Sequence, residues 1–207
     1  MYLSELTLQP GRITYDFLKN VYQVHQRVKA ALPQDPRPLY RIEWNRNGGA
    51  SILVQSVEQQ PDWERAFEDL PVLERYHCTV YDPRFTTGSW LAFRLLGNPT
   101  GCRQGVRYPL IHEADQYAWL NRKLAAAGVQ VYRCQIVGRD RQSTWKTMPA
   151  VGRVRMSHLG VTFEGVLKVA HPNLLSEAVR SGVGAAKGLG FGLLSVMSVG
   201  AERSYFS

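Results

Sequence analysis

The order of hydrophobic patterns along the chain is the feature that most constrains its fold. A strand pattern covers residues 2–9, a helical pattern covers residues 15–32 with Thr14 as its N-cap, and a hairpin pattern covers residues 39–57. A short helix then opens at Pro61, and a strand returns at residues 74–81. The first part of the chain therefore predicts the order βαββαβ.

The second part of the chain predicts the same order again. Strand patterns lie at 90–96, 129–137, 158–169 and 193–199, helical patterns lie at 111–127 and 172–181, and a loop with Arg103 and Arg107 is expected at 98–108. No close sequence repeat accompanies this repeated order. We predict an α+β fold of two tandem ferredoxin-like (RRM-like) domains, 1–85 and 90–207.

The charge of the chain narrows the class of partner. Its 207 residues carry 25 Lys and Arg against 17 Asp and Glu, a net charge of +8, which favours an anionic polymer as partner. No apolar run reaches the ~18–20 residues of a membrane span, and no signal-peptide pattern opens the chain. We expect a cytoplasmic protein with no membrane partner.

Cysteine and histidine spacing gives no sign of a metal or a cofactor. Cys78, Cys102 and Cys134 are widely spaced, and the five histidines show no HExxH pattern. We therefore expect no disulfide, no metal site and no cofactor.

The stretch from Gly182 to Ser195 is the densest concentration of glycine, with five glycines around Lys187. Glycine lets the backbone approach a ligand closely, and such density before a strand predicts a loop whose N–H groups face an anion. Lys187 precedes Gly188, so the stretch is not a Walker loop. The candidate ligand-binding residues of this stretch are Gly184, Lys187, Gly188 and Gly190. The alternative is a close-packed connection that binds nothing.

Tyr22 and His25 are the candidate catalytic pair. Residues three apart project from one face of a helix, and both lie among apolar residues. Cleavage of RNA without a metal requires that the 2′-OH lose a proton and that the departing 5′-oxygen gain one. Histidine titrates near neutral pH and can perform either transfer, whereas tyrosine is better suited to orienting the 2′-OH or to acting as a constrained proton donor. The alternative is a core tyrosine next to a boundary histidine.

A basic hairpin is expected between Arg139 and Arg155. One acid, Asp140, stands among five basic residues, Arg139, Arg141, Lys146, Arg153 and Arg155. Such a hairpin can contact an RNA duplex through its phosphates and through base edges at a stem end or a widened groove. The alternative is a solvated edge hairpin whose charges prevent aggregation.

The chain also resembles a known family. The glycine stretch with its Gly-Leu-Leu-Ser ending resembles the C-terminal loop of the repeat-associated RNA-binding proteins of CRISPR systems, and in particular the CasE family. Further matches are Trp90–Leu95 with Asn98-Pro99, the helix from Pro109 to Leu124, and Phe163–Leu167. The family often has a basic residue where this chain has Leu96-Gly97, which places any RNA contact there in doubt.

The resemblance implies a metal-independent endoribonuclease. CasE proteins cleave CRISPR repeat RNA at the base of a stem-loop, leave a 2′,3′-cyclic phosphate and remain in the Cascade complex with its other subunits. The family carries Tyr-x-x-His, or a helical His alone, at the place of Tyr22 and His25. The resemblance makes Arg27, Lys29 and Lys187 candidates to neutralise the phosphorane, and it implies that the basic hairpin enters the repeat stem.

Two other functions remain open from the sequence. The first is a non-catalytic RNA-binding subunit with the same tandem fold, which a cleavage assay separates from the enzyme. The second is a small-molecule enzyme whose glycine loop binds a nucleotide. Binding of a mononucleotide would depend little on salt, whereas RNA binding through many phosphates weakens steeply as salt rises.

Overall fold

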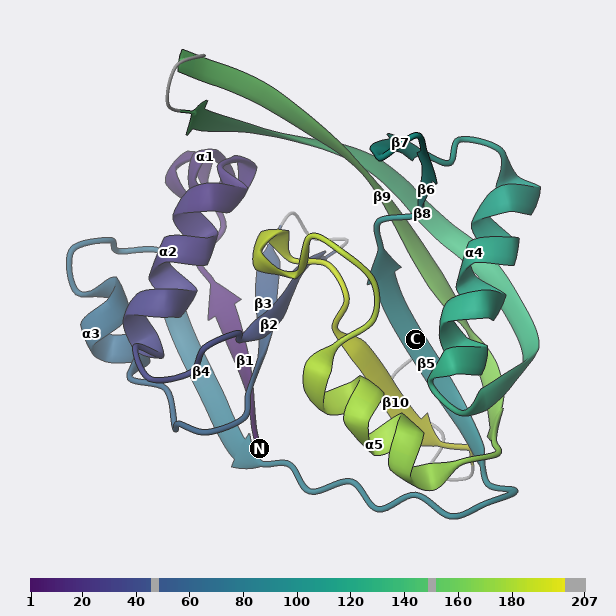
Figure 1. Ribbon diagram of the computed structural model, residues 1–207. Helices are drawn as coiled ribbons and strands as arrows, with labels where there is room; N and C mark the ends of the chain where they lie inside the picture. Colours follow the sequence, from purple (N-terminus) through teal and green to yellow (C-terminus); the bar gives the residue numbers. More distant parts are fainter. Residues whose placement is uncertain (46–48, 149–151, 200–207) are drawn as a thin grey trace. The chain divides into compact units, whose positions relative to one another are not determined.

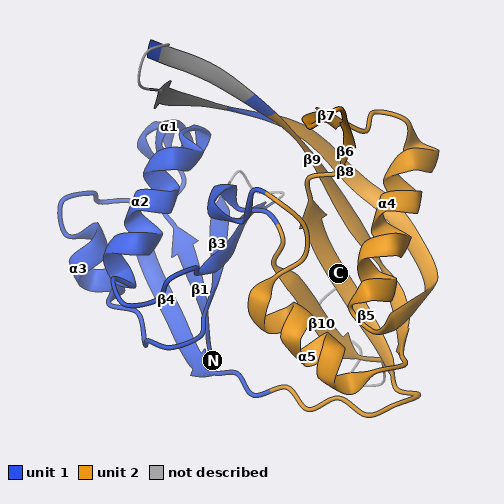
Figure 2. Ribbon diagram, in the orientation of Figure 1, with its two compact units in different colours: residues 1–82, 142–157, 186–191 blue, residues 83–141, 158–185, 192–207 orange. Residues whose placement is uncertain are grey.

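A computed structural model of the chain describes the backbone of residues 1–45, 49–148 and 152–199 (Figure 1). The side chains of residues 144–148 and 153–156 also lie outside the described part. The chain divides into two compact units (Figure 2), of which the first comprises residues 1–82, 142–157 and 186–191 and the second the remainder. The contiguous domain boundaries expected from the sequence, 1–85 and 90–207, stay a prediction.

The first unit is built on a four-stranded sheet with the strand order β2-β3-β1-β4. β1 pairs antiparallel with both β3 and β4, and β2 pairs antiparallel with β3. The strands are β1 (Tyr2–Leu8), β2 (Leu39–Trp44), β3 (Ala50–Ser56) and β4 (Leu73–Val80), and the helices are α1 (Arg12–Lys19), α2 (Val21–Ala31) and α3 (Trp63–Phe67).

The second unit repeats this topology in the order β10-β5-β9-β8. Its sheet is formed by β5 (Trp90–Gly97), β8 (Val129–Met148), β9 (Gly152–Val169) and β10 (Leu194–Ser198), and its helices are α4 (Glu113–Ala126) and α5 (Pro172–Ser181). Of the two long strands, residues 129–141 of β8 and 158–169 of β9 belong to this unit, and their remaining residues belong to the first unit. In both units the first strand lies between the fourth and the third, and a helix follows the first and third strands. The predicted α+β fold of two ferredoxin-like domains is confirmed.

Each core follows from the periodicity of its elements. In the first unit, Val24 and Val28 of α2 are buried together with Leu6 and Ile52 of the sheet. In the second unit, alternate residues of β5 and β9 point inward, and Phe163 stacks on Trp119 of α4 with ring centroids 6.2 Å apart.

None of the helices in the described segments is long and apolar enough to cross a lipid bilayer.

The single helix expected over residues 15–32 is wrong, because the chain breaks at Asn20. The backbone N–H of Asn20 donates to Phe17 O at 3.1 Å, and its side-chain Oδ1 accepts from Gln23 N at 3.3 Å. Asn20 therefore ends α1 and caps α2, a role that asparagine favours. The expected cap, Thr14, is instead buried within α1. The break places Tyr22 and His25 in the first two turns of α2.

The loop expected at residues 98–108 is also wrong, because it contains a small hairpin. β6 (Thr100–Arg103) pairs antiparallel with β7 (Val106–Pro109). The turn between them places Gln104 at φ 51° and Gly105 at φ 78°, the signs that a type I′ turn requires. Glutamine seldom occupies that region of φ, so the sequence did not reveal the turn.

Candidate active site

α2 presents its two candidate catalytic side chains at the edge of its buried face. Val21, Val24 and Val28 are buried at helical spacing. Tyr22 is 53% exposed, and His25, three residues later, is half-buried at the boundary of the core. The helix therefore holds both side chains at the surface of the first unit, one turn apart.

The glycine-rich loop reaches the imidazole of His25. The loop contains a short 3-10 helix, η1 (Lys187–Leu189), whose central residue is Gly188. A Cβ placed on Gly188 would lie 3.4 Å from His25 Cε1 and 3.6 Å from His25 Nδ1. The backbone of the loop therefore lies directly against the ring, with no side chain between them.

A buried hydroxyl joins this loop to the start of α2. Tyr40 of β2 is fully buried, and its hydroxyl lies 3.1 Å from Gly188 O and 3.2 Å from Val21 O. Burial raises the pKa of Tyr40 far above its ordinary value, so the group stays protonated and can donate its single proton to one of these carbonyls at a time. Tyr40 is thus a structural member of the site, which it joins through tertiary contacts.

The environment of His25 favours a neutral ring. Burial, and then the positive charge of Lys29, lower the pKa of His25 below 6.5. Nδ1 of His25 is buried and has no hydrogen-bond partner among the residues that the structure describes. At neutral pH the imidazole is thus uncharged and able to accept a proton.

Lys29 is held one turn beyond His25. Its Nζ donates to Asp35 O at 2.5 Å. The carboxylate of Asp35 is buried and accepts from Arg37 N at 3.0 Å and Val57 N at 2.6 Å. The ammonium group is therefore anchored on the chain that follows α2, and its charge acts on His25 from a fixed position.

Arg27 lies in an ion pair with Asp69 rather than in an open position. Nη1 donates to Asp69 Oδ1 and to Ala66 O, and Nη2 donates to Asp69 Oδ2 at 3.0 Å. This fork ties α2 to the end of α3. Contact between Arg27 and RNA stays a prediction, and it would have to compete with Asp69 for the guanidinium.

The other glycine-loop residues occupy distinct settings. Lys187 begins η1, and its side chain is half-buried. Gly190 has φ 86°, and a Cβ placed on it would lie 3.2 Å from the ring of Tyr40. Gly184 belongs to the second unit and lies against Trp119. Close packing accounts for glycine at Gly184 and Gly190, and ligand binding by either stays a prediction.

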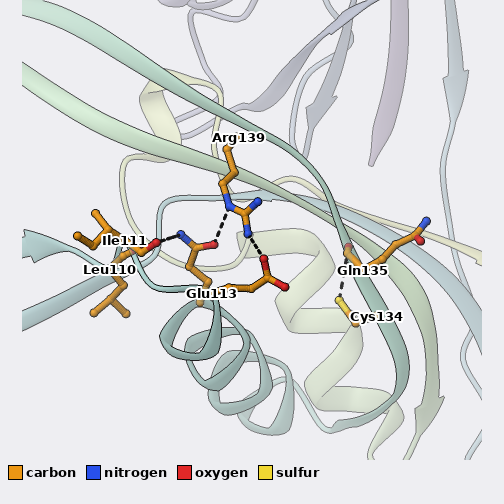
Figure 3. Close-up of polar contacts among 7 residues, drawn as sticks. Leu110, Ile111, Glu113, Cys134, Gln135 and Arg139 are labelled. Atoms are coloured by element: carbon orange, nitrogen blue, oxygen red, sulfur yellow. Dashed lines mark hydrogen bonds and ion pairs between the residues drawn. The ribbon is translucent and has the colours of Figure 1, made fainter.

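The basic hairpin is formed by the long strands β8 and β9. Near its base, Arg139 donates to Glu113 Oε2 at 2.5 Å and to Gln116 Oε1 at 3.2 Å (Figure 3). Arg139 thus joins β8 to the start of α4. Arg141 is exposed and has no polar partner among the described residues. The side chains of Lys146, Arg153 and Arg155 lie outside the described residues, so their RNA contacts stay predictions.

Comparison with known proteins places the chain in a family. The model of the family described as CRISPR associated protein matches residues 1–197. The chain belongs to this CRISPR-associated family. The resemblance inferred from the glycine stretch and the strand and helix motifs is confirmed.

Two curated members of the CRISPR-associated family match along almost their entire length. CRISPR system Cascade subunit CasE of Escherichia coli K12 is 30% identical over 95% of this chain and 98% of its own. CRISPR-associated endoribonuclease Cse3 of Thermus thermophilus is 29% identical over 95% of this chain and 99% of its own. A solved structure of CRISPR endoribonuclease Cse3 bound to a 19-nucleotide RNA is 30% identical, covers 95% of this chain and 100% of its own, and superposes with a TM-score of 0.84.

No cluster of three His, Cys, Asp or Glu side chains suited to hold a metal ion occurs within the described residues of this family member. The groups that its first unit brings together are an imidazole, a phenol, an ammonium group and a glycine backbone, contributed by Tyr22, His25, Lys29 and Gly188. Such a set can transfer a proton and stabilise negative charge on a phosphate.

Proposed function

We propose that the chain is an endoribonuclease that cleaves CRISPR repeat RNA at the base of its stem-loop without using a metal. Attack of a 2′-OH on the adjacent phosphorus breaks the bond to the 5′-oxygen and leaves a 2′,3′-cyclic phosphate. The protein then keeps the processed RNA and joins the Cascade complex. Because the substrate is a CRISPR transcript, we place the protein in the cytoplasm.

The observation that carries this proposal is the contact between the His25 ring and the Gly188 backbone. The neutral imidazole takes the proton of the 2′-OH, and the same proton passes to the departing 5′-oxygen. Tyr22 orients the attacking hydroxyl from the preceding turn. Lys29 and Lys187 stabilise the charge on the phosphorane, and one such contact contributes about 3 kcal/mol.

The basic hairpin would bind the RNA stem. Arg141, Lys146, Arg153 and Arg155 would contact its phosphates and position the scissile bond at the stem base. Holding the 2′-oxygen in line with the leaving oxygen contributes much of the rate in such reactions. The names of the relatives Cse3 and CasE support both the cleavage and the assembly into Cascade.

A non-catalytic RNA-binding subunit is the second candidate. It retains the fold and the basic hairpin but uses Tyr22 and His25 only for packing. The buried, unpartnered Nδ1 of His25 within the described residues argues against it, because an unsatisfied buried polar group costs about 1–3 kcal/mol. A site that needs a free imidazole explains why such a group is kept.

Cleavage in the presence of a chelator tests the proposal. The full chain should cut the stem-loop RNA of its accompanying repeat array equally well with and without EDTA. The upstream product should end in a cyclic phosphate, and 2′-deoxy substitution at the scissile nucleotide should abolish cutting. Loss of activity on chelation, or a 3′-OH on the upstream product, would contradict the mechanism.

The pH dependence of cleavage should show an acid limb. His25 accepts a proton only when neutral, so kcat/KM should be level at pH 7 and above and should fall as pH drops through the His25 pKa, below 6.5. Lys29→Met removes one cause of the lowered pKa and should shift the limb to higher pH. Single-turnover rates at sub-saturating protein, recorded across this pH range, measure the position of the limb in both proteins. A limb centred above pH 7 in the wild type would contradict this assignment.

A further inference from the structure

The β6–β7 hairpin carries two arginines that the proposed function leaves unused. Arg103 ends β6 and Arg107 lies within β7. Both are exposed, and neither has a hydrogen-bond or ion-pair partner among the described residues. Arg27 and Arg139, in contrast, are engaged with carboxylates. The hairpin thus presents positive charge that no acid within the described part of the chain neutralises.

The geometry of the ribbon separates the two guanidinium groups. In the register of the hairpin, Arg103 lies opposite Val106, and Arg107 lies opposite Cys102. Successive residues of a strand point to opposite faces, and directly paired residues point to the same face. The side chains of Arg103 and Arg107 therefore project from opposite faces of the two-stranded ribbon. A ribbon of this kind can reach phosphates on either side of a groove at once.

The hairpin is held in place although it is short. Isolated two-stranded hairpins are marginally stable, so its conformation needs support from its surroundings. The ring of Tyr108 covers Gly101 so closely that a Cβ there would overlap it. Leu110 N donates to Pro99 O at 3.0 Å and closes the base.

The same base is joined to the strand that leads into the basic hairpin. Gln116 is fully buried, and its Nε2 donates to Leu110 O at 2.9 Å and to Ile111 O at 3.3 Å, while its Oε1 accepts from Arg139 (Figure 3). Arg141 follows two residues later and points to the same face of β8 as Arg139. The β6–β7 hairpin is therefore connected, within the second unit, to Arg139 and Arg141 at the start of the basic hairpin.

We propose that the β6–β7 hairpin is a second RNA-binding element, which contacts phosphates of the repeat stem through Arg103 and Arg107. The proposal rests on the proposed function, since it concerns the same RNA. The charge of the two arginines favours a nucleic acid over a protein as the occupant of this surface. A protein docked on Val106, which is 68% exposed, and on Tyr108 is the competing outcome.

The test compares RNA affinity across salt concentrations. The full chain and the double variant Arg103→Ala/Arg107→Ala are titrated with the repeat stem-loop carrying a 2′-deoxy scissile nucleotide. We expect the Kd to rise about tenfold at about 0.15 M salt and the slope of log K against log salt to become shallower by about 2, roughly one unit for each lost phosphate contact. Arg103→Lys/Arg107→Lys keeps both charges and should restore most of the slope.

A charge-matched control separates local contact from net charge. Arg122 of α4 and Arg133 of β8 are exposed and have no polar partner among the described residues. Arg122→Ala/Arg133→Ala should change the Kd by less than twofold. An equal loss in this control, or an unchanged Kd and slope in the hairpin variant, would overturn the proposal. Wild-type protein that neither binds nor cuts the RNA would instead contradict the proposed function.

Discussion

His25→Ala should lower the single-turnover cleavage rate by about a thousandfold, because positioned proton transfer contributes roughly 10²–10⁴-fold to such reactions. The imidazole lies against Gly188 at the surface of the first unit, and its Nδ1 has no hydrogen-bond partner within the described residues. Its removal should therefore leave the fold and the RNA affinity nearly intact. Rates at saturating protein, together with the Kd for 2′-deoxy RNA, measure the two effects separately.

Two comparisons make this result specific to proton transfer. His25→Gln keeps a polar side chain of similar size and should remain as inactive as His25→Ala. Tyr22→Phe removes only an orienting hydroxyl and should cost less, on the order of tenfold, since one hydrogen bond to a neutral group contributes about 1 kcal/mol. A His25→Ala protein that cleaves within tenfold of the wild type would remove His25 from the chemistry.

Gly190→Ala should destabilise the first unit and lower cleavage with it. Gly190 has φ 86°, a conformation that costs an alanine about 1–2 kcal/mol, and the new methyl would lie 3.2 Å from the ring of Tyr40. Tyr40 would have to shift, and its hydroxyl contacts to Gly188 and Val21 would loosen. We expect a lower midpoint of thermal unfolding and a cleavage rate reduced about tenfold.

Gly188→Ala is the matched control in the same loop. The φ of Gly188 is not in the left-handed region, and its added methyl would make ordinary contact with the His25 ring at 3.4 Å. This variant should unfold within about 0.5 kcal/mol of the wild type, as substitutions without strain usually do. Equal destabilisation by both substitutions would contradict the assigned role of the Gly190 backbone.

The periodicity of the sequence was sufficient for the two ferredoxin-like folds, because each strand and helix buries residues at its own spacing. The break at Asn20 and the turn at Gln104 were missed because both depend on a single residue's backbone conformation. Hydrophobic periodicity is judged over several residues, so it does not reveal the backbone conformation of a single one.

The contacts between residues of the site that are far apart in the chain could not be predicted from the sequence. The pair Tyr22 and His25 was found from helical spacing together with the family resemblance. The contact of His25 with Gly188 and the link through Tyr40, 148 positions before Gly188, depend on tertiary packing. From their charge alone, Arg27 and Arg139 were predicted to bind RNA. In the fold, Arg27 forms an ion pair with Asp69, and Arg139 forms one with Glu113.

In the proposed mechanism, the His25 imidazole removes the proton of the attacking 2′-OH. A crystal structure of the protein with its repeat stem-loop, carrying a 2′-O-methyl group at the scissile nucleotide, tests this most directly. We expect an imidazole nitrogen of His25 within about 3.2 Å of that 2′-oxygen, the reach of a general base. A scissile nucleotide bound with its 2′-oxygen out of reach of His25 would contradict it.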